Sequence, residues 1–175
     1  MLKMIVVILA VLIAVILIYA STQPDTFRIQ RTAAIQAAPD KIFAYLNDFH
    51  TWTAWSPWEK VDPGMKRVYS GTPSGLGTVY EWEGNKKIGQ GRMEIIESAK
   101  PSRIKLKLDF LKPFEAHNTT LFALEPKNGA TEVTWAMEGP SNLMMKVLHL
   151  FMNMDKMIGG DFERGLANLK ALAEK

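Results

Sequence analysis

The N-terminal segment constrains this chain most. Of the first 20 residues, 19 are apolar and only Lys3 is charged. The run Met4–Ala20 has no Gly or Pro, and as a helix it would be about 26 Å long, enough to cross the core of a bilayer. A cleaved signal peptide is the alternative, but it needs a basic leading region, a shorter apolar stretch and an A-x-A-like site. We therefore predict a retained transmembrane anchor over residues 1–20.

The charges that flank this segment bear on its orientation. Lys3 and the α-amino group lie on one side, and Arg28 and Arg31 lie on the other, so the positive-inside rule barely discriminates. We expect a single-pass membrane protein with a short cytoplasmic tail and the domain on the extracytoplasmic side. Residues 21–26 are polar and contain Pro24, which is typical of a linker. Residues 27–175 are long enough for one domain with a sizeable core.

Composition excludes several classes of protein. The chain has no cysteine, which rules out a disulfide scaffold, a Cys-ligated metal site and a thiol nucleophile. Three histidines leave little room for a His-rich metal site, so we expect no metal and no cofactor. The net charge of +3 is small and evenly spread, which argues against a nucleic-acid partner.

After the linker, the chain shows repeated strand signals. Charged and apolar side chains alternate strictly from Arg103 to Phe110, which predicts a strand with one buried face. Two short helices are expected after the first strand: one begins at Ala38-Pro39, and the aromatic, irregular stretch from Asn47 to Trp58 forms a second short helix or a turn. The expected strands are Phe27–Thr32, Lys66–Ser70, Thr78–Glu83, Lys87–Glu97, Arg103–Leu111, Glu115–Glu125 and Thr131–Gly139.

From Ser141 the apolar period becomes helical and continues to the C-terminus. We predict one long helix, with Gly159-Gly160 as a kink or a point of close backbone approach. The element order predicts an α+β fold, in which a curved antiparallel sheet of about seven strands wraps around the long C-terminal helix. Such a sheet leaves space beneath it that a ligand can fill.

Four local patterns point to a known family. They are Ala38–Asp48 leading to Trp52 and Trp55–Trp58, then Gly75–Trp82, Thr131–Trp135 and Asp161–Lys170. In this order they resemble the SRPBCC, or polyketide cyclase/dehydrase-like, family of the START/Bet v 1-like superfamily. The resemblance covers the chain from about Thr26 to Lys175 and implies a helix-grip fold. Since the superfamily includes lipid carriers, hormone receptors, aromatic cyclases and quinone-binding proteins, it implies no single reaction.

Strand parity predicts which side chains line the interior. The helical period adds Phe151 to them, and Asn118 and Thr120 would supply the polar contacts that orient a ligand. Trp55 belongs either to the core or to the mouth of the cavity. The predicted ligand-binding residues are Trp55, Tyr80, Trp82, Met93, Leu108, Phe110, Asn118, Thr120, Phe122, Trp135, Met137 and Phe151.

Other groups keep two interpretations open. Arg92 and Glu94 pair on the solvated face, unless a bulge makes them a buried acid/base pair. His117 is expected to point outward. Five methionines between Met144 and Met157 are either helix core or a deformable lid, and one of the adjacent pair Met144 and Met145 must face away from the core.

No motif identifies a reaction. The chain lacks G-x-S-x-G, H-E-x-x-H and a phosphate-cradling loop. We therefore favour a membrane-tethered binding domain for a small hydrophobic ligand, such as a lipid, a quinone or an aromatic metabolite, over an enzyme. The alternatives are a cyclase, dehydratase or hydrolase acting on a similar molecule, and a regulatory or assembly partner in the membrane. Converging buried ionisable groups would favour the enzyme, whereas a filled interior would favour the regulatory partner.

Overall fold

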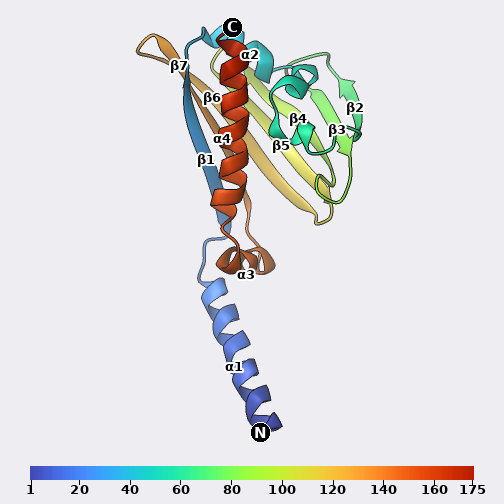
Figure 1. The fold of residues 1–175 in the computed structure, drawn as a ribbon, viewed down its shortest axis with the longest axis vertical. Coiled ribbons are helices and arrows are strands. Elements are labelled where there is room, and N and C mark those ends of the chain that lie inside the picture. The colour runs from blue at the N-terminus through green and yellow to red at the C-terminus, as the bar shows by residue number, and fades with distance from the viewer.

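A computed structural model describes residues 1–175. The apolar helix α1 (Leu2–Ser21) extends away from a domain built of one sheet and several helices (Figure 1). The helical elements of the domain are α2 (Pro39–Leu46), the 3₁₀ helices η1 (Phe49–Ala54) and η2 (Pro57–Lys60), α3 (Leu143–Phe151) and α4 (Met154–Ala173). The strands are β1 (Thr26–Ile35), β2 (Lys66–Gly71), β3 (Thr78–Glu83), β4 (Gln90–Ala99), β5 (Arg103–Lys112), β6 (Ala116–Lys127) and β7 (Ala130–Pro140).

The seven strands form one antiparallel sheet in the order β1-β7-β6-β5-β4-β3-β2. All seven predicted strands are confirmed, and so is the α+β class. The strand predicted from Lys87 begins only at Gln90, because Asn85–Gly89 form a turn. In this turn the Gly89 amide donates to Asn85 O at 2.8 Å, and Gly89 has φ +69°, which favours glycine.

The predicted long C-terminal helix is confirmed as α4, but the prediction that it continues unbroken from Ser141 is wrong. Two helices are present, because Met152 is extended and the side chain of Asn153 caps α4 by accepting from the Lys156 amide at 2.9 Å. Gly159 lies inside α4 without a break in the helix. A Cβ at this position would collide with the guanidinium of Arg31, so the predicted close approach is confirmed at Gly159.

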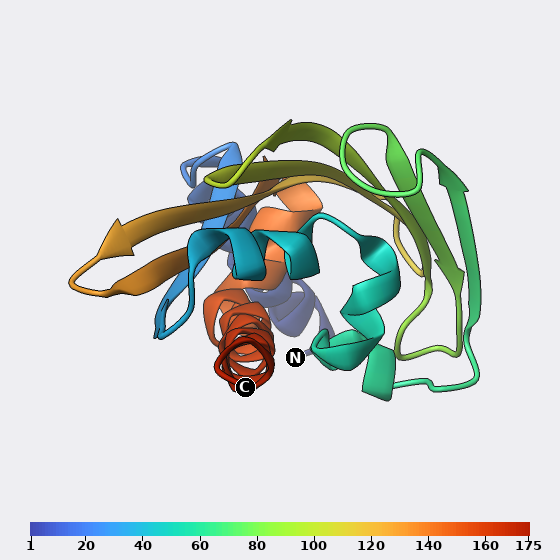
Figure 2. The same cartoon turned by 90° about the horizontal axis from the view of Figure 1, so that it is seen from above.

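Two groups of helices lie side by side against the concave face of the sheet. Figure 2 shows the sheet as an arch, with α4 beneath one side and the α2–η2 segment beneath the other. Thus α4 covers chiefly β1. The sequence-based expectation that this helix covers the whole concave face is wrong. The buried side chains of α4 include Phe162, Leu166 and Leu169, as predicted.

The interior between the sheet and the helices has a near end and a far end. The near end adjoins α1 and includes Phe27, Phe110, Asn118, Gly139 and the first turns of α4. The far end lies toward the turn between β6 and β7 and the C-terminus of α4 (Figure 1). Because the sheet is antiparallel and in regular register, each strand except the short β2 and β3 extends from one end to the other.

Candidate functional site

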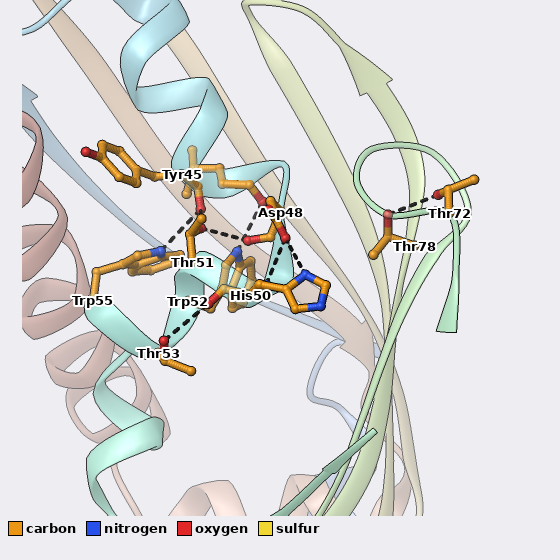
Figure 3. A network of polar contacts seen from close by, with 10 residues as sticks. Tyr45, Asp48, His50, Thr51, Trp52, Thr53, Trp55, Thr72 and Thr78 are labelled. Carbon is orange, nitrogen blue, oxygen red and sulfur yellow. Dashed lines mark hydrogen bonds and ion pairs between the residues drawn. The ribbon is translucent and has the colours of Figure 1, made fainter. Parts of the chain in front are cut away.

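The aromatic segment after α2 is part of the core. The indole N–H of Trp52 donates to Leu46 O at 3.1 Å, and that of Trp55 donates to Tyr45 O at 3.3 Å (Figure 3). These bonds satisfy carbonyls in the last turn of α2, which have no partner within the helix. Both rings are buried, and Asn168 Nδ2 of α4 donates to Trp55 O at 3.0 Å. Of the two interpretations of Trp55, the structure supports core packing.

Aromatic rings fill the interior from the middle of the strands toward the far end. Trp135 stacks on Phe162 of α4 at 4.3 Å between centroids, with the ring planes 7° apart. Phe122 and Trp55 approach the same indole at 4.9 and 5.5 Å. The Nε1 of Trp135 is buried without a hydrogen-bond partner. These contacts leave Trp135 and Phe122, both predicted ligand residues, inside a packed core.

Burial falls along the strands toward the near end. On the inner face of β5, Ile104 and Leu106 are fully buried, Leu108 is 9% exposed and Phe110 is half-buried. Met93 of β4 is also half-buried, whereas Ile95, further along the same face, is not exposed at all. Other predicted ligand residues in this part of the interior are Tyr80, Trp82 and Met137, all buried. The inner face is therefore least covered where the sheet approaches α1.

Polar side chains mark the same region. Asn118 and Thr120 are buried on the inner face of β6, as predicted. Gly139 of β7 lacks a side chain where a Cβ would collide with Asn118 Oδ1, so glycine here makes room for the amide. On the outer face Arg92 pairs with Glu94 at 2.8 Å, and both side chains are about one-third exposed. The interpretation of these two residues as a buried acid/base pair is thus wrong.

His117 lies on the outer face, as predicted, with an exposed side chain. Its Nδ1 lies 2.7 Å from Asp109 Oδ1, and this hydrogen bond raises the pKa of His117. Burial raises the pKa of Asp109, but its hydrogen bonds with His117 and Lys107 outweigh burial, so the net shift is downward. This group is directed away from the interior.

One buried ionic cluster escaped the sequence analysis. Glu59 of η2 accepts from Tyr80 Oη at 2.6 Å and from Arg67 Nε at 2.7 Å. Burial, and then the hydrogen bond to Glu59, raises the pKa of Tyr80, so the phenol stays protonated. Both carboxylate oxygens are occupied, and the cluster fastens η2 to β2 and β3. The alternation of Arg67 and Tyr69 on β2 could have signalled two inward side chains, but nothing local identified Glu59 as their partner.

The prediction that Phe151 covers the interior is wrong. The break at Met152 turns α3 away from the axis of α4, and Phe151 is 71% exposed. The methionines are not helix core throughout either, because Met144, Met152 and Met157 are exposed. One member of the pair Met144 and Met145 was predicted to face away from the core, and the structure shows that it is Met144.

Two hollows of the surface lie outside the sheet–helix interior. One is formed by Gln36–Pro39 with Pro126–Thr131, at the far end. The other lies at the near end and is lined mainly by polar groups of β1, β6 and β7, among them Arg28, His117 and Glu138. The interior itself contains no free pair of acidic and basic side chains, so its chemistry at the near end is that of an apolar surface with an amide and a hydroxyl.

Comparison with known proteins agrees with this architecture. Residues 26–174 match the family described as "Polyketide cyclase / dehydrase and lipid transport". The chain belongs to this family. No curated protein matches it.

Among solved structures, ginseng major latex-like protein 151 from Panax ginseng has a TM-score of 0.59 at 11% identity, covering 87% of this chain and 100% of that one. Protein CV1439 from Chromobacterium violaceum has a TM-score of 0.59 at 17% identity, and the match covers 87% of this chain and 99% of that one. StfQ, a di-domain ARO/CYC protein from the steffimycin biosynthetic pathway, gives 0.61 at 13% identity, over 85% of this chain and 51% of its own.

At these identities the neighbours establish the fold alone, which is the Bet v 1-like helix-grip fold. These solved structures thus share the sheet and the C-terminal helix with this chain. The apolar helix α1 precedes the part that matches the family. It has the length and composition of a membrane span or of a signal sequence, with a mean hydropathy of 3.1.

Proposed function

We propose that the chain is a membrane-tethered binding domain for a small hydrophobic ligand, which enters the interior at its near end. The observation that carries this proposal is the decrease in burial along β5, from fully buried Ile104 to half-buried Phe110. An apolar surface that its own chain leaves partly uncovered can gain free energy by covering itself with an apolar ligand. In this proposal residues 1–20 are the retained anchor and residues 21–26 the linker.

The filled far end limits what can bind. Trp135, Phe122 and Phe162 occupy the space that a bulky ligand would need, so a flat or single-chain molecule fits the near end better than a two-tailed phospholipid. Asn118 and Thr120 supply an amide and a hydroxyl to orient its polar group. A lipid, a quinone or an aromatic metabolite has this chemistry.

Binding is favoured over catalysis because of the ionic cluster. An acid–base enzyme needs a titratable group that can reach its substrate, but both oxygens of Glu59 are already bonded to Tyr80 and Arg67. The filled far end favours one other candidate, a regulatory or assembly partner whose interior binds nothing. For the tether we keep the orientation with a short cytoplasmic tail and an extracytoplasmic domain.

Native mass spectrometry of the full chain, released from detergent micelles, tests the proposal. We expect a small apolar adduct on the unmodified protein and its loss in Met93→Trp, which fills the near end. Ile96→Trp is the matched control, because Ile96 is exposed on the same strand. Met93→Ala, which makes space instead, should keep the adduct. Absence of any adduct would favour the regulatory partner, and equal adducts on both Trp variants would place the ligand outside the interior.

A further inference from the structure

Helix α3 has its polarity inverted relative to a helix on a water-soluble surface. Its one charged side chain, Lys146, is 6% exposed, whereas Met144 and Phe151 are 66% and 71% exposed. The other exposed apolar side chains of α3 are Leu143, Leu148 and Leu150. A surface helix in water buries its apolar face and exposes its charges. The outward face of α3 therefore suits an apolar environment.

The buried lysine fixes α3 to the base of α1. Lys146 Nζ lies 2.6 Å from Asp25 Oδ1 in the segment that joins α1 to β1, and the Ser141 amide donates to Asp25 O at 2.7 Å. The hydrogen bond with Lys146 lowers the pKa of Asp25, which keeps the carboxylate charged. Across the same junction, Phe27 and His149 are in edge-to-face contact at 6.1 Å between ring centroids.

These contacts place α3 beside the end of α1 (Figure 1). Ala20 is the one buried residue of α1, so the rest of that apolar helix is free to contact lipid. If α1 crosses a bilayer, as the proposed function requires, its last turn lies at the bilayer surface and α3 lies at the same depth. A second exposed aromatic residue, Phe114, lies in the turn between β5 and β6, also at the near end.

We propose that α3 lies in the interfacial layer of the bilayer that α1 crosses, with Met144 and Phe151 immersed among the lipids. A helix with one apolar face binds there by burying that face at the boundary between headgroups and acyl chains. The inference rests on the proposed membrane tether and adds to it a second, independent attachment. With two attachments, the near end of the interior faces the bilayer, which is the source of apolar ligands.

Depth-dependent fluorescence quenching tests this placement in the full chain. The protein has no cysteine, so Met144→Cys and Phe151→Cys each offer one site for an environment-sensitive dye. In vesicles of phosphatidylethanolamine and phosphatidylglycerol that contain nitroxide-labelled lipid, we expect several-fold stronger quenching at these sites than at the control Leu76→Cys. Leu76 is 61% exposed, but it lies in the turn between β2 and β3 at the far end.

A label in α1 at Val11→Cys separates the two proposals. Strong quenching at Val11 together with quenching at Phe151 no greater than at Leu76 would overturn the placement of α3 and leave the tether intact. No quenching at Val11 would overturn the tether itself. If the dye at Phe151→Cys is shielded from nitroxide lipid, and the unlabelled variant forms a disulfide with a second copy under a mild oxidant, the apolar face of α3 is a protein interface and the inference is wrong.

Discussion

The two ends of the interior are built from the same strands and the same alternation of side chains, yet they are packed differently. At the far end, α2 and η1 bring buried rings such as Trp55 against Phe122 and Trp135. At the near end, Met93 and Phe110 remain half-buried. Whether an inward apolar side chain belongs to the core or to an exposed binding surface thus depends on which helical residues cover it. Strand periodicity alone does not distinguish the two cases.

The largest expected effect separates core from binding surface. Phe162→Ala removes the ring stacked on Trp135 and should lower the free energy of unfolding by about 3–5 kcal/mol. Met93→Ala at the near end should cost less than about 2 kcal/mol, because that side chain is only half-buried. Urea unfolding of the full chain in detergent micelles, followed by tryptophan fluorescence, measures both. Equal losses would show that the near end is ordinary core.

The next effect concerns the ionic cluster that closes one side of the interior. Glu59→Gln removes the charge that Arg67 and Tyr80 share, and should cost about 1.5–3 kcal/mol, the range for hydrogen bonds to charged groups. The control Glu94→Gln breaks an exposed pair with Arg92 and should cost about 1 kcal/mol or less. Unfolding by urea gives both values. A small loss for Glu59→Gln would mean that hydrogen bonds to solvent replace those that Glu59 makes in the cluster.

Two adjacent glycines in the first half of α4 allow a finer comparison. A Cβ at Gly159 would displace the guanidinium of Arg31 from its contacts with Asp155 (2.9 Å) and Glu163 (2.6 Å). Gly159→Ala should therefore weaken these ion pairs by more than it gains in helix propensity, and destabilise the protein by about 1 kcal/mol or less. At Gly160 the nearest atom would be Arg164 Nη1, at 3.9 Å. Gly160→Ala should instead stabilise the helix by about 0.5–1 kcal/mol, and opposite signs in thermal unfolding would confirm the close approach.

The strands could be predicted from the sequence because their signal is local. Alternation along Arg103–Leu111 fixes both the strand and its inner face, and the burial of Leu108 follows. The break between α3 and α4 was missed because apolar residues recur at helical spacing across it, and the capping side chain of Asn153 was overlooked. The prediction for Phe151 is wrong for the same reason. In one unbroken helix, Phe151 would lie on the same face as the core residues of α4.

The candidate site depends more on tertiary structure. The positions of η1, η2 and α4 over the sheet decide which rings fill the interior. No single segment of the sequence specifies these positions. The pairing of Glu59 with Arg67 links two elements across a turn, and that of Lys146 with Asp25 links residues far apart in the chain. Sequence therefore predicted which side chains point inward, but not which remain uncovered.

The smallest expected effect lies on the outer face of the near end. On the outer face, the far end has the ion pair Lys127–Glu132, which is largely exposed. The near end has His117 hydrogen-bonded to Asp109, whose side chain is only 10% exposed. Since Asp109 raises the pKa of His117, the stabilisation from this contact is complete below the unfolded pKa of about 6.5. It is lost as the pH rises through the higher pKa of the folded state.

An NMR titration of the His117 ring in the full chain should accordingly give a pKa above about 6.5. Asp109→Asn should bring it down, while Glu132→Gln, at the far end, should leave it unchanged. Glu115 also lies 3.3 Å from His117 Nε2, so part of the shift should persist in Asp109→Asn and disappear in the double variant with Glu115→Gln. If Asp109→Asn leaves the titration of His117 as it was, the hydrogen bond does not persist in solution, and the outer face gives no distinction between the two ends.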